Sequence, residues 1–103
     1  VGGYTGRHIP LHNVSFIGNR AGITGADKHI TQSYFHANEF GIRGVERTDV
    51  DLSIFERNDV AANGGRGKFS CNIVRDNRIG VQAFFEGWEL TGNLFQGNTE
   101  GSV

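Results

Sequence analysis

The sequence has little of what marks several common classes of small protein. Its one cysteine, Cys71, cannot form an internal disulfide, which excludes a small disulfide scaffold. No apolar run approaches the length of a membrane-spanning segment, and the chain does not start with a basic and then apolar signal pattern. Ten Lys and Arg balance eleven Asp and Glu, leaving a formal net charge of −1. We therefore expect no nucleic-acid partner and no membrane insertion.

What the chain has in excess is glycine and aromatic residues. Its 103 residues suffice for one domain, and sixteen of them are glycine. Glycine at this level indicates either flexible low-complexity chain or many tight turns. Aromatic residues make up 11% of the chain, which argues against disorder. Many regularly placed turns are the interpretation that remains.

An internal repeat of about 20 residues accounts for much of this composition. Five asparagines follow one another at intervals of 19, 20, 19 and 21 residues: Asn19, Asn38, Asn58, Asn77 and Asn98. Apolar residues stand three positions before each of them: Phe16, Phe35, Phe55, Val74 and Phe95. A second apolar set stands eight positions before each: Leu11, Ile30, Val50, Phe69 and Leu90. These columns form a repeat that covers residues 9–103.

Each repeat is expected to be one coil of a solenoid. Gly, Asn, Ser and Thr interrupt every window before three helical turns could form, whereas short runs of Phe, Ile, Val and Thr predict strands. The predicted fold is an all-β, single-stranded right-handed parallel β-helix of about five coils. Their expected boundaries are 9–28, 29–48, 49–67, 68–87 and 88–103. No segment is available to cap either end, which is typical of a piece of a longer β-helix or of a module that stacks end to end.

The recurring asparagines are expected to form a structural ladder, because a stacked amide can bond to its neighbour and to turn backbone. Glycine or alanine three positions later permits either a positive φ or a close backbone approach: Gly22, Gly41, Ala61, Gly80 and Gly101. The two apolar columns have opposite parity on one straight strand, so a bend between them is expected. It is placed near the residues five positions before each ladder asparagine: Ser33, Ser53, Asn72 and Asn93.

The pattern apolar-x-x-Ser/Asn-x-Phe-x-x-Asn-x-x-Gly-Ile, complete in residues 30–42, resembles the right-handed parallel β-helix repeats of the pectate-lyase-like superfamily. The resemblance covers nearly the whole chain. It implies a secreted, periplasmic or cell-surface protein that binds, cleaves or epimerises acidic polysaccharides. Family catalytic motifs do not carry over, since Arg47-Thr48-Asp49 departs from Asn-Thr-Asp and no His-Gly is present. A leucine-rich repeat is the alternative fold, although Ser or Asn stands where that family has Leu.

Charged residues one period apart are expected to pair across adjacent coils, which explains the balanced net charge. One like-charged pair remains, Glu39 and Asp59. Their carboxyls are expected about 5–6 Å apart, as in a retaining glycosidase, and such a pair raises one pKa and supplies an acid and a base. Arg20 and Arg78 flank this pair and would instead hold both carboxylates ionised. Both interpretations stay open, and a catalytic function would be that of a polysaccharide lyase, hydrolase or epimerase.

Three further groups of residues are candidates for ligands. Phe85 and Trp88 could stack on sugar rings, with Arg20 and Arg78 as further carbohydrate contacts, or could cover the core. Glu46, Asp49 and Asp51 could bind calcium as a cofactor or form a solvated turn, since their spacing matches no compact calcium loop. Cys71 is expected to be a small filler, and the four histidines are expected to lie on different faces: His8, His12, His29 and His36.

The residues four positions before the ladder asparagines are Tyr34, Ile54, Ile73 and Leu94. Strict alternation turns them outward as an apolar stripe that marks an interface, whereas a different bend turns them inward. Two functions follow from these features. One is a polysaccharide-binding or polysaccharide-modifying β-helix. The other is a structural solenoid without catalysis that joins partner chains or other copies of a β-helix, through its open ends or through this stripe.

Overall fold

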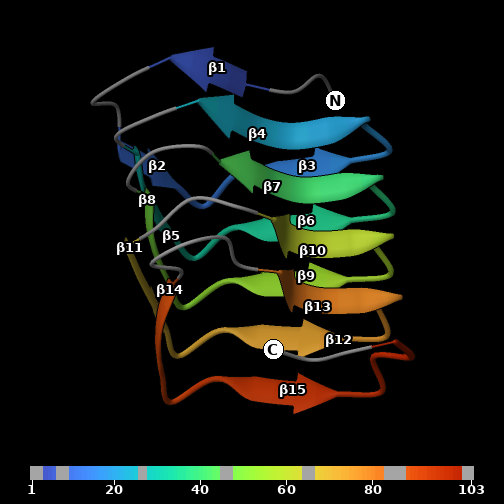
Figure 1. Ribbon diagram of the computed structural model, residues 1–103. Coiled ribbons are helices and arrows are strands. Elements are labelled where there is room, and N and C mark those ends of the chain that lie inside the picture. The colour runs from blue at the N-terminus through green and yellow to red at the C-terminus, as the bar shows by residue number, and fades with distance from the viewer. Residues whose placement is uncertain are drawn as a thin grey trace.

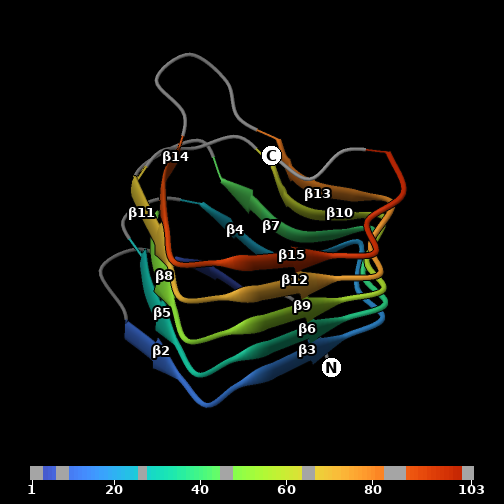
Figure 2. The ribbon, with the colours of Figure 1, turned by 90° about the horizontal axis from the view of Figure 1, so that it is seen from below.

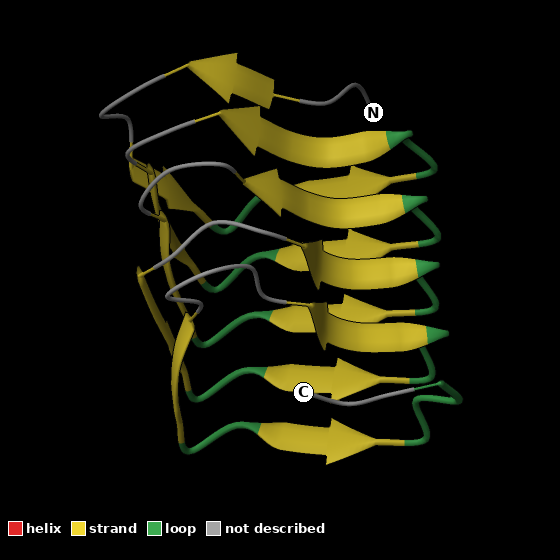
Figure 3. Cartoon of the chain, viewed as in Figure 1, coloured by secondary structure: helices red, strands yellow, loops and turns green. Residues whose placement is uncertain are grey.

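The computed structural model describes residues 4–6, 10–25, 28–44, 48–63, 67–82 and 88–100. These residues form fifteen strands and no helix, wound as a parallel β-solenoid (Figures 1 and 3). About four turns separate the first from the last strand of each sheet, so each of the three sheets has five strands. Within these residues no helix is long and apolar enough to cross a membrane. The all-β solenoid prediction is confirmed, whereas its handedness stays a prediction.

The strands of successive turns stack into three sheets that enclose the core when seen along the axis (Figure 2). Sheet A consists of β1 (Tyr4–Gly6), β4 (Ala21–Gly25), β7 (Phe40–Gly44), β10 (Val60–Asn63) and β13 (Ile79–Gln82). Sheet B consists of β2 (Pro10–His12), β5 (Lys28–Thr31), β8 (Thr48–Asp51), β11 (Gly67–Ser70) and β14 (Trp88–Thr91). Sheet C consists of β3 (Ser15–Ile17), β6 (Tyr34–His36), β9 (Ile54–Glu56), β12 (Ile73–Arg75) and β15 (Leu94–Gln96). Three strands in each repeat and no described helix do not fit a leucine-rich repeat.

The register of the sheets reproduces the columns of the repeat. In sheet C, Phe35 pairs with Phe16 and Phe55, and in sheet B, Val50 pairs with Ile30 and Phe69. The inward residues of the middle coils are almost fully buried: Ile30, Phe35, Ile42, Val50, Phe55, Phe69 and Val74. Both apolar columns are therefore core, as the repeat predicts. Parallel stacking buries them because each coil covers the apolar face of the next.

The core keeps its volume when one column changes residue size. The rings of Phe16 and Phe35 stack at 5.2 Å between centroids, and those of Phe35 and Phe55 at 4.5 Å. The next residue of this column is the smaller Val74. In the same coil the column of sheet B has Phe69 in place of the smaller Val50, and the ring centroids of Phe69 and Phe55 are 5.4 Å apart. This exchange of a large and a small residue between the two columns suits a densely packed core.

Two corners in each coil are made by residues with positive φ that are mostly not glycine. At the corner between sheets B and C these residues are Asn13, Gln32, Leu52, Cys71 and Gly92, with φ between 47° and 65°. At the corner between sheets C and A they are Gly18, Ala37, Arg57, Asp76 and Gly97, with φ between 57° and 72°. The predicted bend therefore exists, one residue earlier than Ser33 and its equivalents. The left-handed residue at the first corner reverses the parity of the strand, so both apolar columns face the core.

A buried or half-buried polar side chain follows every left-handed residue of the two corners except Asn13, which precedes Val14. Apart from that of Asn19, these side chains hydrogen-bond to a neighbouring coil. Asn38 Nδ2 donates to Asn58 Oδ1 at 3.0 Å and to the Phe16 carbonyl at 2.9 Å, while Asn38 N donates to the same Asn58 oxygen at 3.0 Å. The same bonds recur from Asn58 to Asn77 and from Asn77 to Asn98. Asn19 joins through its backbone N–H, which donates to Asn38 Oδ1 at 2.8 Å. The predicted asparagine ladder is thus hydrogen-bonded through the described coils.

The glycine column allows close approach rather than a positive φ. Gly22 and Gly41 lie inside β4 and β7, and neither is among the positive-φ residues. A Cβ on Gly22 would lie 2.7 Å from the Gly41 carbonyl oxygen and 3.2 Å from the Phe35 ring. Of the two alternatives that the sequence allowed, the structure uses the second, because neighbouring coils lie close to β4 and β7 at these glycines.

Candidate functional site

The outer face of sheet B is polar on every described coil. Its outward side chains form two rows that run across the strands. The first row is Pro10, His29, Asp49, Lys68 and Glu89, and the second is His12, Thr31, Asp51, Ser70 and Thr91. Between the two rows lie Ile30, Val50 and Phe69, whose side chains point into the core. The face therefore offers carboxylate, hydroxyl, imidazole and ammonium groups on a rigid sheet.

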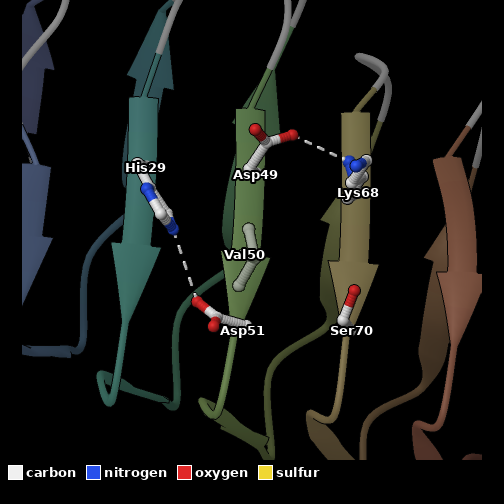
Figure 4. A pocket seen from close by; sticks show the side chains of 6 residues that line it. All are labelled: His29, Asp49, Val50, Asp51, Lys68 and Ser70. Carbon is white, nitrogen blue, oxygen red and sulfur yellow. Dashed lines mark hydrogen bonds and ion pairs between the residues drawn. The ribbon is translucent and has the colours of Figure 1, made fainter.

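The middle of this face is hollowed. A shallow cavity of about 190 Å³ lies across β5, β8 and β11 and is lined by His29, Asp49, Val50, Asp51, Lys68 and Ser70 (Figure 4). Asp49 and Asp51 stand on one face of β8 because they are two residues apart on a strand. His29 reaches the hollow from β5, and Lys68 and Ser70 reach it from β11. Three coils thus contribute to one site.

The two carboxylates of the hollow have different surroundings. Asp49 Oδ1 accepts a hydrogen bond of 2.9 Å from the backbone N–H of Lys68. Asp51 Oδ1 is buried and has no hydrogen-bond partner among the described residues, although His29 Nε2 lies 3.6 Å away. That distance is too long for a hydrogen bond. The Asp51 side chain as a whole is 39% exposed, so the part of it that the hollow offers to a ligand is not this buried oxygen.

Gly67 is part of this site, and the repeat did not point to it. Its φ is 134°, and a Cβ there would overlap the Thr48 carbonyl oxygen and lie 2.9 Å from Asp49 Oδ1. The missing side chain lets the start of β11 lie against β8, so that the next N–H reaches the Asp49 carboxylate. A glycine at a strand start is the signal that could have identified this contact.

A second polar cluster lies on the outer face of sheet C. The Tyr34 hydroxyl donates to Glu56 Oε1 at 2.6 Å, and Arg75 Nε donates to Glu56 Oε2 at 2.9 Å. The Tyr34 hydroxyl bond and then Arg75 lower the pKa of Glu56, and the same hydroxyl bond raises the pKa of Tyr34. His36 Nδ1 lies 3.1 Å from the Tyr34 oxygen, and the two rings stack. The hydrogen bonds of this cluster are made within the protein, which suits a structural role.

Tyr34, Ile54, Ile73 and Leu94 all turn outward on sheet C, which decides between the two orientations that the sequence left open. They lie side by side in register, with Leu94 52% exposed and the other three half-buried. The row is a continuous outer stripe, here called the sheet C stripe. Its chemistry is mixed, since Tyr34 is tied to Glu56.

The predicted acid–base pair, Glu39 and Asp59, lies on exposed residues beside the corner between sheets C and A. Arg78 donates to both oxygens of Asp59, at 2.6 Å and 3.3 Å, and also to Glu100 at 2.9 Å. These hydrogen bonds lower the pKa of Asp59, the opposite of the shift that a general acid needs. Asp59 therefore has the ionised, arginine-bound state that flanking by Arg78 predicts, and catalysis by the pair stays a prediction.

The other predicted ligands are only partly visible. Glu46 and Phe85 lie outside the described residues, and for Trp88 only the strand position at the start of β14 is described. Arg20 is exposed beside the corner between sheets C and A, where its carbonyl accepts from the backbone of Phe40. Among the described residues, no three His, Cys, Asp or Glu side chains come close enough to hold a metal ion. Calcium binding by Asp49 and Asp51 together with Glu46 stays a prediction.

The prediction that the histidines lie on different faces is wrong for two of them, because His12 and His29 both point outward on neighbouring strands of sheet B. His12 Nδ1 is 2.8 Å from the hydroxyl of Thr31 on sheet B, and His36 lies on sheet C. His8 lies outside the described residues. Cys71 is free and exposed at a left-handed corner position, so it is not a core filler.

Comparisons of the chain with protein-family models, with curated proteins and with solved structures found no match. The parallel β-solenoid with its three sheets is therefore what is shown, and no family is assigned. Function has to be argued from the outer faces of the sheets, where the hollow on sheet B carries the most varied chemistry.

Proposed function

We propose that this protein binds polysaccharide along the outer face of sheet B, with the hollow as its main contact. The supporting observation is the hollow itself, in which acceptors and donors from three coils converge. Small-molecule sites combine a concave surface with a few well-placed polar groups in this way. The Asp51 side chain is 39% exposed in the hollow, so its carboxylate can accept a hydrogen bond from a sugar hydroxyl.

The repeat of the solenoid suits a linear polymer. Parallel strands are about 4.8 Å apart, so an extended chain that crosses them meets one new pair of outward side chains at each step. On sheet B those pairs are polar from β2 to β14, apart from Pro10. Binding rather than cleavage is proposed, because Asp59, the one predicted catalytic carboxylate with a shifted pKa, is held ionised by Arg78.

Membership of the pectate-lyase-like superfamily, a right-handed coil and a secreted, periplasmic or cell-surface location belong to this proposal. They rest on the repeat pattern of residues 30–42. The buried ladder and the three-sheet coil are compatible with them.

A glycan array followed by chemical-shift mapping tests this function. For any glycan retained on the array, amide shifts should concentrate on β5, β8 and β11 and leave the outer face of sheet C unchanged. Replacing Lys68 by Ala should weaken binding several-fold by removing an ammonium donor from the hollow. Arg57→Ala is the matched control, since it removes one exposed cation at a corner where another coil has Ala37. Retention of no glycan, or shifts confined to sheet C, would contradict the proposal.

The sheet C stripe supports a second candidate function, a structural solenoid that associates through this face. Tyr34, Ile54, Ile73 and Leu94 make an adjacent outward row, and such rows mark interfaces. Light scattering across a concentration series would detect a dimer, and Ile54→Lys should abolish it. Leu52→Lys is the matched control, because Leu52 is 54% exposed but lies off the stripe. A monomer at every concentration would exclude this function.

A further inference from the structure

Asp51 stands in a row of hydroxyl groups on sheet B. Its register partners are Thr31 on β5 and Ser70 on β11, and both carry hydroxyls. A sugar hydroxyl donates one hydrogen bond and accepts others, so it can donate to Asp51 and accept from Ser70. This combination of one carboxylate with neighbouring hydroxyls suits a neutral pyranose ring.

The exposed carboxylate of the hollow requires a ligand that donates. The Asp51 side chain is 39% exposed, and His29 Nε2 lies 3.6 Å from its buried Oδ1. A hydroxyl that donates to the exposed part of this ionised carboxylate makes a charge-assisted hydrogen bond, which is stronger than one between neutral groups. The carboxylate of a uronic acid has no proton to donate at neutral pH. The group that distinguishes acidic from neutral sugars therefore cannot fill this position.

The fixed charges of the hollow also disfavour an anion. Two of its lining residues, Asp49 and Asp51, are carboxylates, and one, Lys68, is a full cation. The two carboxylates are two residues apart on β8, hence within about 7 Å of each other along the strand. A uronate seated there would face both. We infer, on the basis of the glycan-binding function proposed above, that the hollow selects a neutral hexopyranose unit over a uronic acid.

The inference is tested with four polymers: laminarin and mannan as neutral probes, polygalacturonate and alginate as acidic ones. Dissociation constants are measured by calorimetry at physiological salt, for the wild type and for Asp51→Asn. The wild type should bind a neutral probe at least about tenfold more tightly than either acidic one. Asp51→Asn should weaken neutral binding by about tenfold, the loss expected of one hydrogen bond to a charged acceptor. The same change should strengthen uronate binding, because one repelling charge is gone.

Asp76→Asn is the matched control for charge. Asp76 is exposed at the corner between sheets C and A, and its φ of 58° suits asparagine. It should leave the ratio of neutral to acidic binding unchanged. Circular dichroism and thermal melting show whether each variant is folded. Ser70→Ala is a second variant in the same row, and it should also weaken neutral binding.

The outcomes separate this inference from the proposed function. Uronate binding as tight as neutral binding, still altered by Asp51→Asn, would overturn the selectivity and keep the glycan site. Equal effects of Asp51→Asn and Asp76→Asn would overturn it too, because general charge would then decide. Binding of none of the four polymers, with an empty glycan array, would remove the glycan function itself.

Discussion

The two corners of each coil share a backbone turn and differ in the side chain that follows it. In the middle coils a left-handed residue precedes a buried polar one at both corners. After the corner between sheets C and A that residue is asparagine in every coil, whereas after the corner between sheets B and C it is serine or asparagine in coils two to five. The Ser33 hydroxyl donates to the Thr31 carbonyl, within its own coil. The asparagine amides donate to carbonyls of the preceding coil.

This difference separates making a corner from tying coils together. Either side chain accepts the backbone N–H of the preceding coil, as Ser53 Oγ does from Ser33 and as Asn58 Oδ1 does from Asn38. Only the amide also donates across coils, as Asn58 Nδ2 does to the Phe35 carbonyl. A corner that carries asparagine should therefore contribute more to cooperative stability than a corner that carries serine.

The largest effect is expected for Asn58→Ala. Asn58 is buried and hydrogen-bonds to Asn38, Asn77 and the Phe35 carbonyl, so its loss leaves a buried N–H and a buried carbonyl without partners. At about 1–3 kcal/mol for each such group, we expect a loss of about 3–5 kcal/mol in the free energy of unfolding. Urea denaturation measures it. A loss below about 1 kcal/mol would show that the ladder is not a main source of stability.

Ser53→Ala at the other corner should cost less. The change removes the acceptor of the Ser33 N–H and the donor to the Asp51 carbonyl. It removes no side-chain hydrogen bond to a carbonyl of the preceding coil. We expect a loss of about 1–2 kcal/mol by the same denaturation experiment. Equal losses for Ser53→Ala and Asn58→Ala would break the comparison between the two corners.

Glycine at the left-handed positions should stabilise the protein. Leu52 has a φ of 54° and is 54% exposed, so Leu52→Gly removes backbone strain and loses little burial. The left-handed conformation costs a residue with a Cβ about 1–2 kcal/mol, and the flexibility of glycine in the unfolded chain offsets part of that gain. We expect a net gain of up to about 1 kcal/mol in the free energy of unfolding. Arg57→Gly at the other corner should give a similar gain, and a gain at only one corner would show that the turns differ.

The smallest effect is expected for the dependence of stability on acid pH. Hydrogen bonds from Arg78 lower the pKa of Asp59 below its ordinary value of 3.8. The ionised carboxylate therefore adds stability that is fully present above that value and is lost as the pH falls through the lower folded-state pKa. Because both side chains are more than 40% exposed, solvent screens the pair. Asp59→Asn should slightly lower the melting temperature at pH 7 and not at pH 2, and an equal effect at both would exclude this pair as the cause.

Some features could be predicted because they depend on what a residue shares with its counterpart one period away. The spacing of Asn38 and Asn58, and of Phe35 and Phe55, defines the coil, the core columns and the ladder, since stacked parallel coils place equivalent residues side by side. The polar ladder residues Ser33 and Asn72 were identified as the region of a bend for the same reason.

The features that could not be predicted depend on residues from different columns. The hydrogen bond between Tyr34 and Glu56 joins neighbouring coils at two different positions of the repeat. The ion-pair contact between His29 and Asp51 does the same. The approach of Gly67 to Asp49 depends on how far one strand start moves toward its neighbour. Periodicity contains no information about such diagonal distances.

By itself the sequence determined the period, the inward columns and the hydrogen-bonding ladder, because a repeat of about 20 residues with apolar and amide columns can bury them only by stacking. The tertiary structure decided where the chain turns and what the outer faces present. Leu52 and Cys71 adopt left-handed conformations that their residue types disfavour, because the core on both sides of the corner fixes the turn. That turn sets the direction of the sheet C stripe, and the stacking of β5, β8 and β11 assembles the hollow around Asp51.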